Sequence, residues 1–145
     1  VTLFIQHRLH AAPIYLAPYC GSNGKNASEF TSNATFQSNR NRLLSNLAAA
    51  TASRNGASTG GFRYLTAGNR PDAVYGAFLC RGDLNPDVCQ ECVSTASKAV
   101  AQGCNRVRSA VIWYDKCMLR YSNQSFSSTM TNDPSLRMFN TWNVS

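Results

Sequence analysis

The sequence predicts one α+β domain in which a β-sheet packs against two α-helices. Its 145 residues, 43% of them hydrophobic, suffice for one globular core and exclude a large multidomain enzyme. Short runs with the pattern of β-strands are mixed with two longer segments of helical periodicity. Because these elements do not follow a strict βαβ alternation, the pattern favours an α+β arrangement over a parallel sheet.

The first expected element is a short strand at residues 14–16, ahead of Cys20. Pro13 and Pro18 limit this strand on both sides, because proline cannot donate to a β-ladder. A polar loop follows over residues 21–32.

The first helix is expected from Asn33 onward, since the Ser, Thr and Asn residues at 31–33 can cap its start. Its end is predicted near residues 54–56, where Arg-Asn-Gly follows the last apolar position. The apolar positions that share one helical face are Phe36, Leu43, Leu44, Leu47 and Ala48.

Two strands are expected after this helix. Residues 56–61 are rich in glycine and form a connection, and residues 62–66 then alternate as a strand does. The run at residues 73–80, which ends at Cys80, predicts the next strand.

The second helix is predicted to start at Asn85-Pro86-Asp87. Asn85 can cap the helix, Pro86 suits its first position, and Asp87 complements the positive end of the helix dipole. Gly103 marks the expected end. The stripe between these points consists of Cys89, Cys92, Val93, Ala96, Ala99 and Val100.

The last regular elements are two strands at residues 109–114 and 117–121, which Asp115-Lys116 joins as a hairpin. The chain turns polar from Ser122, and residues 136–142 resemble the start of another element or a linker.

Composition and charge favour an extracellular protein. Only 14% of the residues are charged, and the six cysteines suit an oxidising compartment. The net charge is +7, but the basic residues are spread along the chain from Arg8 to Arg137 and form no arm for nucleic acid. No stretch approaches the length of a transmembrane helix. We therefore expect neither a nucleic-acid partner nor membrane contact by this chain.

The cysteines predict structural disulfides. Cys80, Cys89 and Cys92 form a C-x8-C-x2-C motif, and Cys20, Cys104 and Cys117 complete the set. Fifteen pairings are formally open. A bridge between Cys89 and Cys92 is unfavourable within one helical turn, which removes some pairings and leaves the others open.

Two other uses of the cysteines fit poorly. Zinc would need a second Cys-x-x-Cys or a spaced histidine pair, and the histidines are only His7 and His10. A thioredoxin-like pair would follow a strand, whereas Cys89 follows a loop and Pro86. No metal and no cofactor are expected.

Two motifs resemble the plant stress-antifungal, or ginkbilobin-type, cysteine-rich domain. They are similar above all to the extracellular domains of cysteine-rich receptor-like kinases, and the match runs over residues 14–128 in order and spacing. The motifs are Tyr75-Gly76-x-Phe78-Leu79-Cys80-Arg81-Gly82-Asp83-Leu84-x-Pro86-x-x-Cys89-x-x-Cys92 and Ile112-Trp113-Tyr114-Asp115-Lys116-Cys117-Met118-Leu119-Arg120-Tyr121-Ser122.

The resemblance implies a five-stranded antiparallel sheet with two helices. It also implies three bridges, which are Cys20–Cys104, Cys80–Cys89 and Cys92–Cys117. In this interpretation residues 1–12 are a leader remnant or a disordered tail, residues 13–128 are the cysteine-rich domain, and residues 129–145 are a linker toward a second copy.

Secreted ginkbilobin-type proteins bind mannose through an Asn, an Arg and a Glu at fixed offsets from their cysteines. The same offsets fall here on Gly21, Val111 and Ser122, which supply one hydroxyl group among three residues. The mannose site is therefore not carried over, and the ligand-binding residues stay unassigned.

No catalytic set is expected. Asp87 and Asp115 fit a helix start and a turn, and Glu91 fits an exposed helical charge. The tripeptide at residues 81–83 spells Arg-Gly-Asp, which we interpret as a chance match in a turn. The glycosylation sequons begin at Asn26, Asn33, Asn123 and Asn143, and Asn33 is equally a helix cap.

The resemblance favours a non-catalytic, extracellular ligand-sensing module of a plant stress or defence receptor-like kinase. It would lie in the apoplast or at the outer face of the plasma membrane. Its expected partner is a cell-wall or microbial glycan, or another receptor ectodomain. The alternatives are a free secreted antifungal, carbohydrate-binding defence protein and, third, a thiol-disulfide exchanger.

Overall fold

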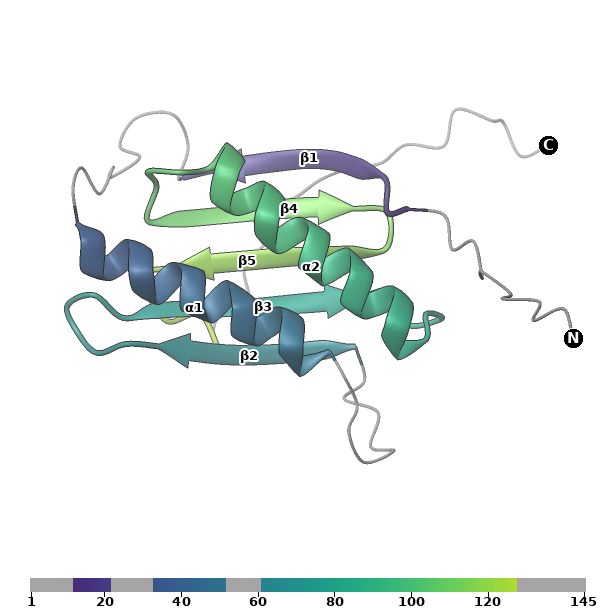
Figure 1. Ribbon diagram of the computed structural model, residues 1–145, viewed down its shortest axis with the longest axis horizontal. Helices are drawn as coiled ribbons and strands as arrows, with labels where there is room; N and C mark the ends of the chain where they lie inside the picture. Colours follow the sequence, from purple (N-terminus) through teal and green to yellow (C-terminus); the bar gives the residue numbers. More distant parts are fainter. Residues whose placement is uncertain (1–11, 22–32, 52–60, 128–145) are drawn as a thin grey trace, which may run out of the picture.

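A five-stranded antiparallel sheet with two helices on one face forms the domain (Figure 1), so the predicted α+β class is confirmed. The computed structural model describes residues 12–21, 33–51 and 61–127. The strand order is β1-β4-β5-β3-β2. The elements are β1 (Tyr15–Cys20), α1 (Ala34–Ala50), β2 (Phe62–Ala67), β3 (Val74–Cys80), α2 (Pro86–Gly103), β4 (Ser109–Tyr114) and β5 (Cys117–Ser122).

Strand β1 is longer than the sequence predicts. It pairs only with β4 and contains Pro18, which lies opposite Ile112. An edge strand tolerates proline because half of its N–H groups face away from the ladder. The expectation that Pro18 limits the strand is therefore wrong, since β1 continues to Cys20.

Helix α1 begins where predicted and ends earlier. The Asn33 Oδ1 accepts a hydrogen bond from the Phe36 N–H at 3.2 Å, which makes Asn33 the N-cap. The helix ends at Ala50 rather than near residues 54–56, which lie outside the described residues. The Thr51 hydroxyl donates to the Ala48 carbonyl at 2.6 Å, so a side chain occupies one of the terminal acceptors.

Helix α2 has the predicted bounds. The Asn85 side chain accepts from the Val88 N–H at 3.0 Å, Pro86 is the first helical residue, and Asp87 lies in the first turn. The helix ends at Gly103, as the sequence indicates.

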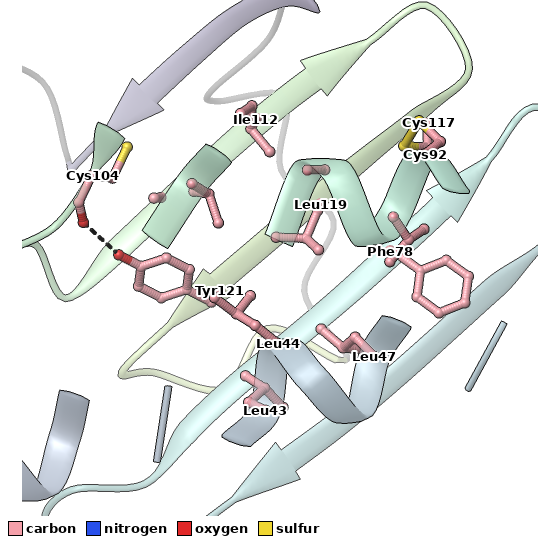
Figure 2. Packing of buried hydrophobic residues seen from close by; sticks show 14 of the residues in the cluster. Leu43, Leu44, Leu47, Phe78, Cys92, Cys104, Ile112, Cys117, Leu119 and Tyr121 are labelled. Carbon is pink, nitrogen blue, oxygen red and sulfur yellow. Dashed lines mark hydrogen bonds between the residues drawn. A yellow bond between two sulfur atoms is a disulfide. The ribbon is translucent and has the colours of Figure 1, made fainter. Parts of the chain in front are cut away.

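The hydrophobic core lies between the sheet and the two helices, which cover the same face (Figure 1). Figure 2 shows that α1 supplies leucines and that β3, β4 and β5 supply alternate residues. Gly76 in β3 marks this face, because a Cβ there would meet the side chains of Leu43 and Leu47. The labelled core residues are Leu43, Leu44, Leu47, Phe78, Cys92, Cys104, Ile112, Cys117, Leu119 and Tyr121.

A polar cluster closes one end of this core. The Tyr121 side chain is fully buried. Its hydroxyl donates to the Cys104 carbonyl oxygen at 3.1 Å (Figure 2) and to the Val107 carbonyl oxygen at 2.9 Å. The Arg40 side chain is also buried and donates to the Asn105 carbonyl at 2.8 Å. Side chains of α1 and β5 thus hold the turn between α2 and β4.

Candidate functional site

All six cysteines of the chain are used in three disulfides, and these are the pairs that the family resemblance implies. Cys89 and Cys92 are buried on α2 and reach β3 and β5 respectively. The remaining bridge, Cys20–Cys104, ties the end of β1 to the end of α2. No thiol is left to exchange disulfides or to bind zinc, which argues against the third interpretation.

Within the described residues, Asp72 and Asp115 each have a structural partner. The Asp115 Oδ1 accepts from the Ile14 N–H at 2.7 Å and so fixes the start of β1 beside the hairpin. The Asp72 Oδ1 accepts from the Asn33 Nδ2 at 2.6 Å. No group of acidic, histidine or cysteine side chains in this part of the chain is arranged to hold a metal ion.

The three positions that correspond to the family mannose site lie at one end of the sheet. The Gly21 N–H donates to the Ser109 carbonyl at 2.8 Å, and Ser109 pairs with Ser122 across the ladder. Val111, on the same strand, is 3% exposed. The fold brings these positions together, but the side chains there offer a sugar almost no donors or acceptors.

The Arg-Gly-Asp tripeptide lies in the exposed turn after β3. The Arg81 Nε donates to the Asp83 carboxylate at 2.6 Å, and this hydrogen bond lowers the pKa of Asp83 and raises the pKa of Arg81. The two charges therefore pair with each other in this exposed turn.

Two of the four sequons lie within the described residues. Both ends of the Asn33 amide are occupied, because the oxygen caps α1 and the nitrogen donates to Asp72. Asn123 is half-buried and follows β5 directly. Asn26 and Asn143 lie outside the described residues.

A groove of about 350 Å³ runs between the two helices on the side away from the sheet. Ser97 bridges its floor by donating to the Leu44 carbonyl at 3.3 Å. Hydroxyl, amide and ammonium groups surround an apolar floor, which suits a polar ligand with an apolar side. The lining residues are Asn41, Leu44, Ser45, Ala48, Ser94, Ser97, Lys98, Ala101 and Gln102.

Sequence reasoning missed this groove. The sequence feature that could have predicted it is a set of small residues on the facing sides of both helices, such as Ala48, Ser97 and Ala101. Small side chains leave a depression between two packed helices, but only the crossing of the helices shows which small residues meet.

The second surface is the side of the sheet that carries no helix, which we call the outer sheet face. It follows from the ladder, because residues opposite each other in an antiparallel pair point to the same side. Residues that alternate with the core positions define it. They are Phe62, Tyr64, Thr66, Tyr75, Ala77, Leu79, Ser109, Val111, Trp113, Met118, Arg120 and Ser122.

The outer sheet face exposes large apolar groups. Phe62 is 52% exposed and Leu79, its partner on β3, is 48% exposed. Trp113 and Met118 pair beside them and are half-buried. The segment after β5 covers part of the face, because the Phe126 ring lies 5.2 Å from the Tyr64 ring and beneath the Arg120 guanidinium.

With this geometry in view, comparison with known proteins places the chain in a family. Residues 19–124 match the family model for salt stress response/antifungal domains, which covers more than half of the sequence. The chain belongs to the salt stress response/antifungal family. This membership confirms the resemblance seen in the cysteine motifs.

Members of the salt stress response/antifungal family include both receptors and secreted proteins. The chain is 41% identical over 134 residues to cysteine-rich receptor-like protein kinase 6 of Arabidopsis thaliana, a match that covers 92% of the chain and 19% of that protein. It is 36% identical over 135 residues to cysteine-rich repeat secretory protein 9 of the same plant, covering 93% of the chain and 39% of that protein.

Solved structures share the fold. The crystal structure of the tandem DUF26 ectodomain of the Arabidopsis thaliana cysteine-rich receptor-like protein PDLP5 matches with a TM-score of 0.64 and 29% identity, over 77% of this chain and 51% of that one. The corresponding ectodomain of PDLP8 matches with a TM-score of 0.65 and 27% identity, over 78% and 50%. The chain thus spans about half or less of the length of these four proteins.

The domain shared with these proteins is an extracellular module and not a catalytic one. Neither helix in the described ranges has the length and apolarity needed to cross a bilayer.

Proposed function

We propose that the chain is a ligand-sensing module in the extracellular part of a plant stress or defence receptor-like kinase, facing the apoplast. The observation that carries the proposal is the 41% identity to such a kinase over 92% of the chain. In this proposal the domain is one half of a tandem pair, as in the PDLP5 and PDLP8 ectodomains, and residues 129–145 lead toward the other half.

The groove between α1 and α2 is the surface that best supports ligand contact. Ser45, Ser94 and Gln102 offer donors and acceptors around its rim, and Lys98 adds a positive charge. Leu44 and Ala101 supply an apolar floor. A glycan presents hydroxyl groups on one side and C–H groups on the other, so cell-wall or microbial oligosaccharides match this lining.

The experiment is a glycan array with the 145-residue chain, followed by calorimetric titration with the best oligosaccharide. Ser94→Trp fills the groove, and we expect it to abolish binding with little loss of stability because the Ser94 side chain is only half-buried and faces the groove. Asn46→Trp is the matched control, since Asn46 is exposed on α1 and does not line the groove.

Two results would contradict the proposed groove. One is an array on which no glycan is retained, together with no binding of plant ectodomain proteins. The other is equal loss of affinity in the Ser94 and Asn46 variants, which would place the ligand elsewhere on the helices.

A secreted defence protein that binds carbohydrate is the second candidate, and it has its own support. The chain is 36% identical to a cysteine-rich repeat secretory protein over 93% of its length. The reading frame beyond residue 145 separates the candidates, because a receptor needs an apolar membrane span and a kinase domain. Inhibition of hyphal growth by the purified chain would favour the secreted protein.

A further inference from the structure

One end of the groove between α1 and α2 is rich in hydrogen-bond donors. The two helices run antiparallel, because Leu44 of α1 meets Ser97 of α2. Further toward the start of α1, Arg40 reaches Asn105, which lies beyond the end of α2. The start of α1 therefore lies beside the end of α2 (Figure 1). We call this part of the groove the donor end, and its lining residues are Asn41, Lys98 and Gln102.

The orientation of the Asn41 amide is fixed by a buried arginine. The Arg40 guanidinium donates to the Asn41 Oδ1, with Nε at 3.4 Å and Nη2 at 3.3 Å. A guanidinium group carries donors only, so the amide atom that faces it is the oxygen. The amide nitrogen and its two N–H groups are directed away from Arg40. Because Asn41 is exposed and lines the groove, it offers a ligand donors rather than an acceptor.

The donor end is also positively charged. Within the described part of the chain, no residue that lines the groove is acidic, and Lys98 supplies a positive charge there. Helix α1 contains no aspartate or glutamate. On α2, Glu91 precedes Lys98 by about two helical turns, which is about 10 Å along the axis. The exposed Arg106 follows Asn105 and adds a second cation near the same end. The donor end therefore favours an anionic group.

We infer that the donor end binds the carboxylate of an acidic sugar, so that the ligand of the groove is an oligosaccharide with uronate groups. The inference rests on the glycan binding proposed above and deepens it by naming the class of glycan. Lys98 supplies the charge, and the Asn41 amide supplies a directed hydrogen bond to the carboxylate. The apolar floor at Leu44 and Ala101 contacts the C–H side of the sugar rings.

The test is calorimetric titration of the 145-residue chain with a short oligogalacturonate and with the same oligomer after methyl esterification of its carboxyl groups. Esterification removes the charges and keeps the hydroxyl groups and the C–H sides of the rings. We expect the acid to bind about 10-fold more tightly than the ester. This difference should shrink at about 1 M salt, where the Debye length falls to about 3 Å.

A parallel titration with a short oligomannuronate and its methyl ester separates two sources of the same chemistry. Galacturonate is a sugar of plant cell walls, whereas mannuronate occurs in bacterial polysaccharides. Tighter binding of either uronate than of its ester supports the inference, and the preferred uronate names the source.

Substitutions at the donor end give an independent measurement. Lys98→Gln removes the charge, and we expect it to lower the affinity for the acid about 10-fold and to leave the affinity for the ester unchanged. Asn41→Asp keeps an acceptor for Arg40 but replaces the amide donors by a negative charge, so we expect at least as large a loss for the acid. Arg63→Gln is the matched control, because Arg63 is exposed on the edge strand β2 and does not line the groove.

Two results would overturn the inference and leave the proposed glycan binding intact. One is equal affinity for the uronates and their methyl esters, which would make the groove a site for neutral glycans. The other is an equal loss of affinity in the Lys98 and Arg63 variants, which would show attraction to the net charge of the chain rather than to the donor end. A chain that binds neither the uronates, nor their esters, nor any neutral glycan contradicts the proposed function itself, and the inference with it.

Discussion

At the scale of single residues, Tyr121 shows how one hydroxyl group organises the end of the core. Its ring is fully buried, and its hydroxyl reaches the carbonyl oxygens of Cys104 and Val107. Burial raises the pKa of this hydroxyl, while the nearby Arg40 lowers it by a smaller amount. The folded state therefore favours the neutral phenol.

This pKa shift predicts a loss of stability in alkali. Because the folded pKa lies above the unfolded value of about 10, the contribution of Tyr121 is complete below that pH and falls as the pH rises through the folded pKa. Tyr121→Phe removes the donor, and we expect it to cost about 1–3 kcal/mol of unfolding free energy near neutral pH. The deficit should shrink above about pH 10.

Urea unfolding of both proteins, followed by tryptophan fluorescence across this pH range, measures the effect. Tyr75→Phe is the control, because Tyr75 is only half-buried and lies on the opposite face of the sheet. A deficit that stays constant with pH would show that the Tyr121 hydroxyl does not titrate as described.

At the scale of elements, the close approach of α1 to the sheet depends on one glycine, Gly76. A Cβ at Gly76 would lie 2.7 Å from Leu43 Cδ2, 3.1 Å from Leu47 Cδ1 and 3.2 Å from the Arg120 carbonyl oxygen. The helix approaches β3 this closely because the strand presents no side chain there. The same approach brings α1 beside α2, where the groove forms.

We therefore predict that Gly76→Ala pushes α1 away from β3 and lowers the free energy of unfolding by about 1–3 kcal/mol. Gly82→Ala is the matched control, since a Cβ at Gly82 meets no atom within 4 Å. Denaturant unfolding under non-reducing conditions compares the two. Equal stability of both variants would mean that the core absorbs the added methyl group without displacement of α1.

At the scale of the whole molecule, the disulfides fix how distant segments meet. Cys20–Cys104 spans 84 positions of the sequence, Cys92–Cys117 spans 25, and Cys80–Cys89 spans 9. A longer closed loop removes more entropy from the unfolded chain. The bridge that closes the longest loop also holds β1, which pairs with one strand only.

We predict that replacing Cys20 and Cys104 together by alanine destabilises the protein by about 4–5 kcal/mol, against about 2–3 kcal/mol for the Cys80 and Cys89 pair. Guanidinium unfolding of the two double variants measures this order. The reverse order would show that packing around the buried Cys80–Cys89 bridge outweighs loop entropy.

The sequence by itself determined the elements and the class of the fold. Helix α2 was predictable to the residue because its signals are local, with Asn85 as cap, Pro86 in the first position and Gly103 at the end. The end of α1 was not, because the Thr51 hydroxyl bonds back to Ala48 ahead of the expected signals. Periodicity could show an inward face on each element, but not which faces meet.

Only the tertiary structure decided which surfaces the molecule offers. The groove exists because two helices cross at small residues that are distant in sequence, and the outer sheet face exists because both helices lie on one side. Local patterns report the neighbours of a residue along the chain. Its neighbours across the sheet depend on strand order, and that order is set by packing of the whole domain.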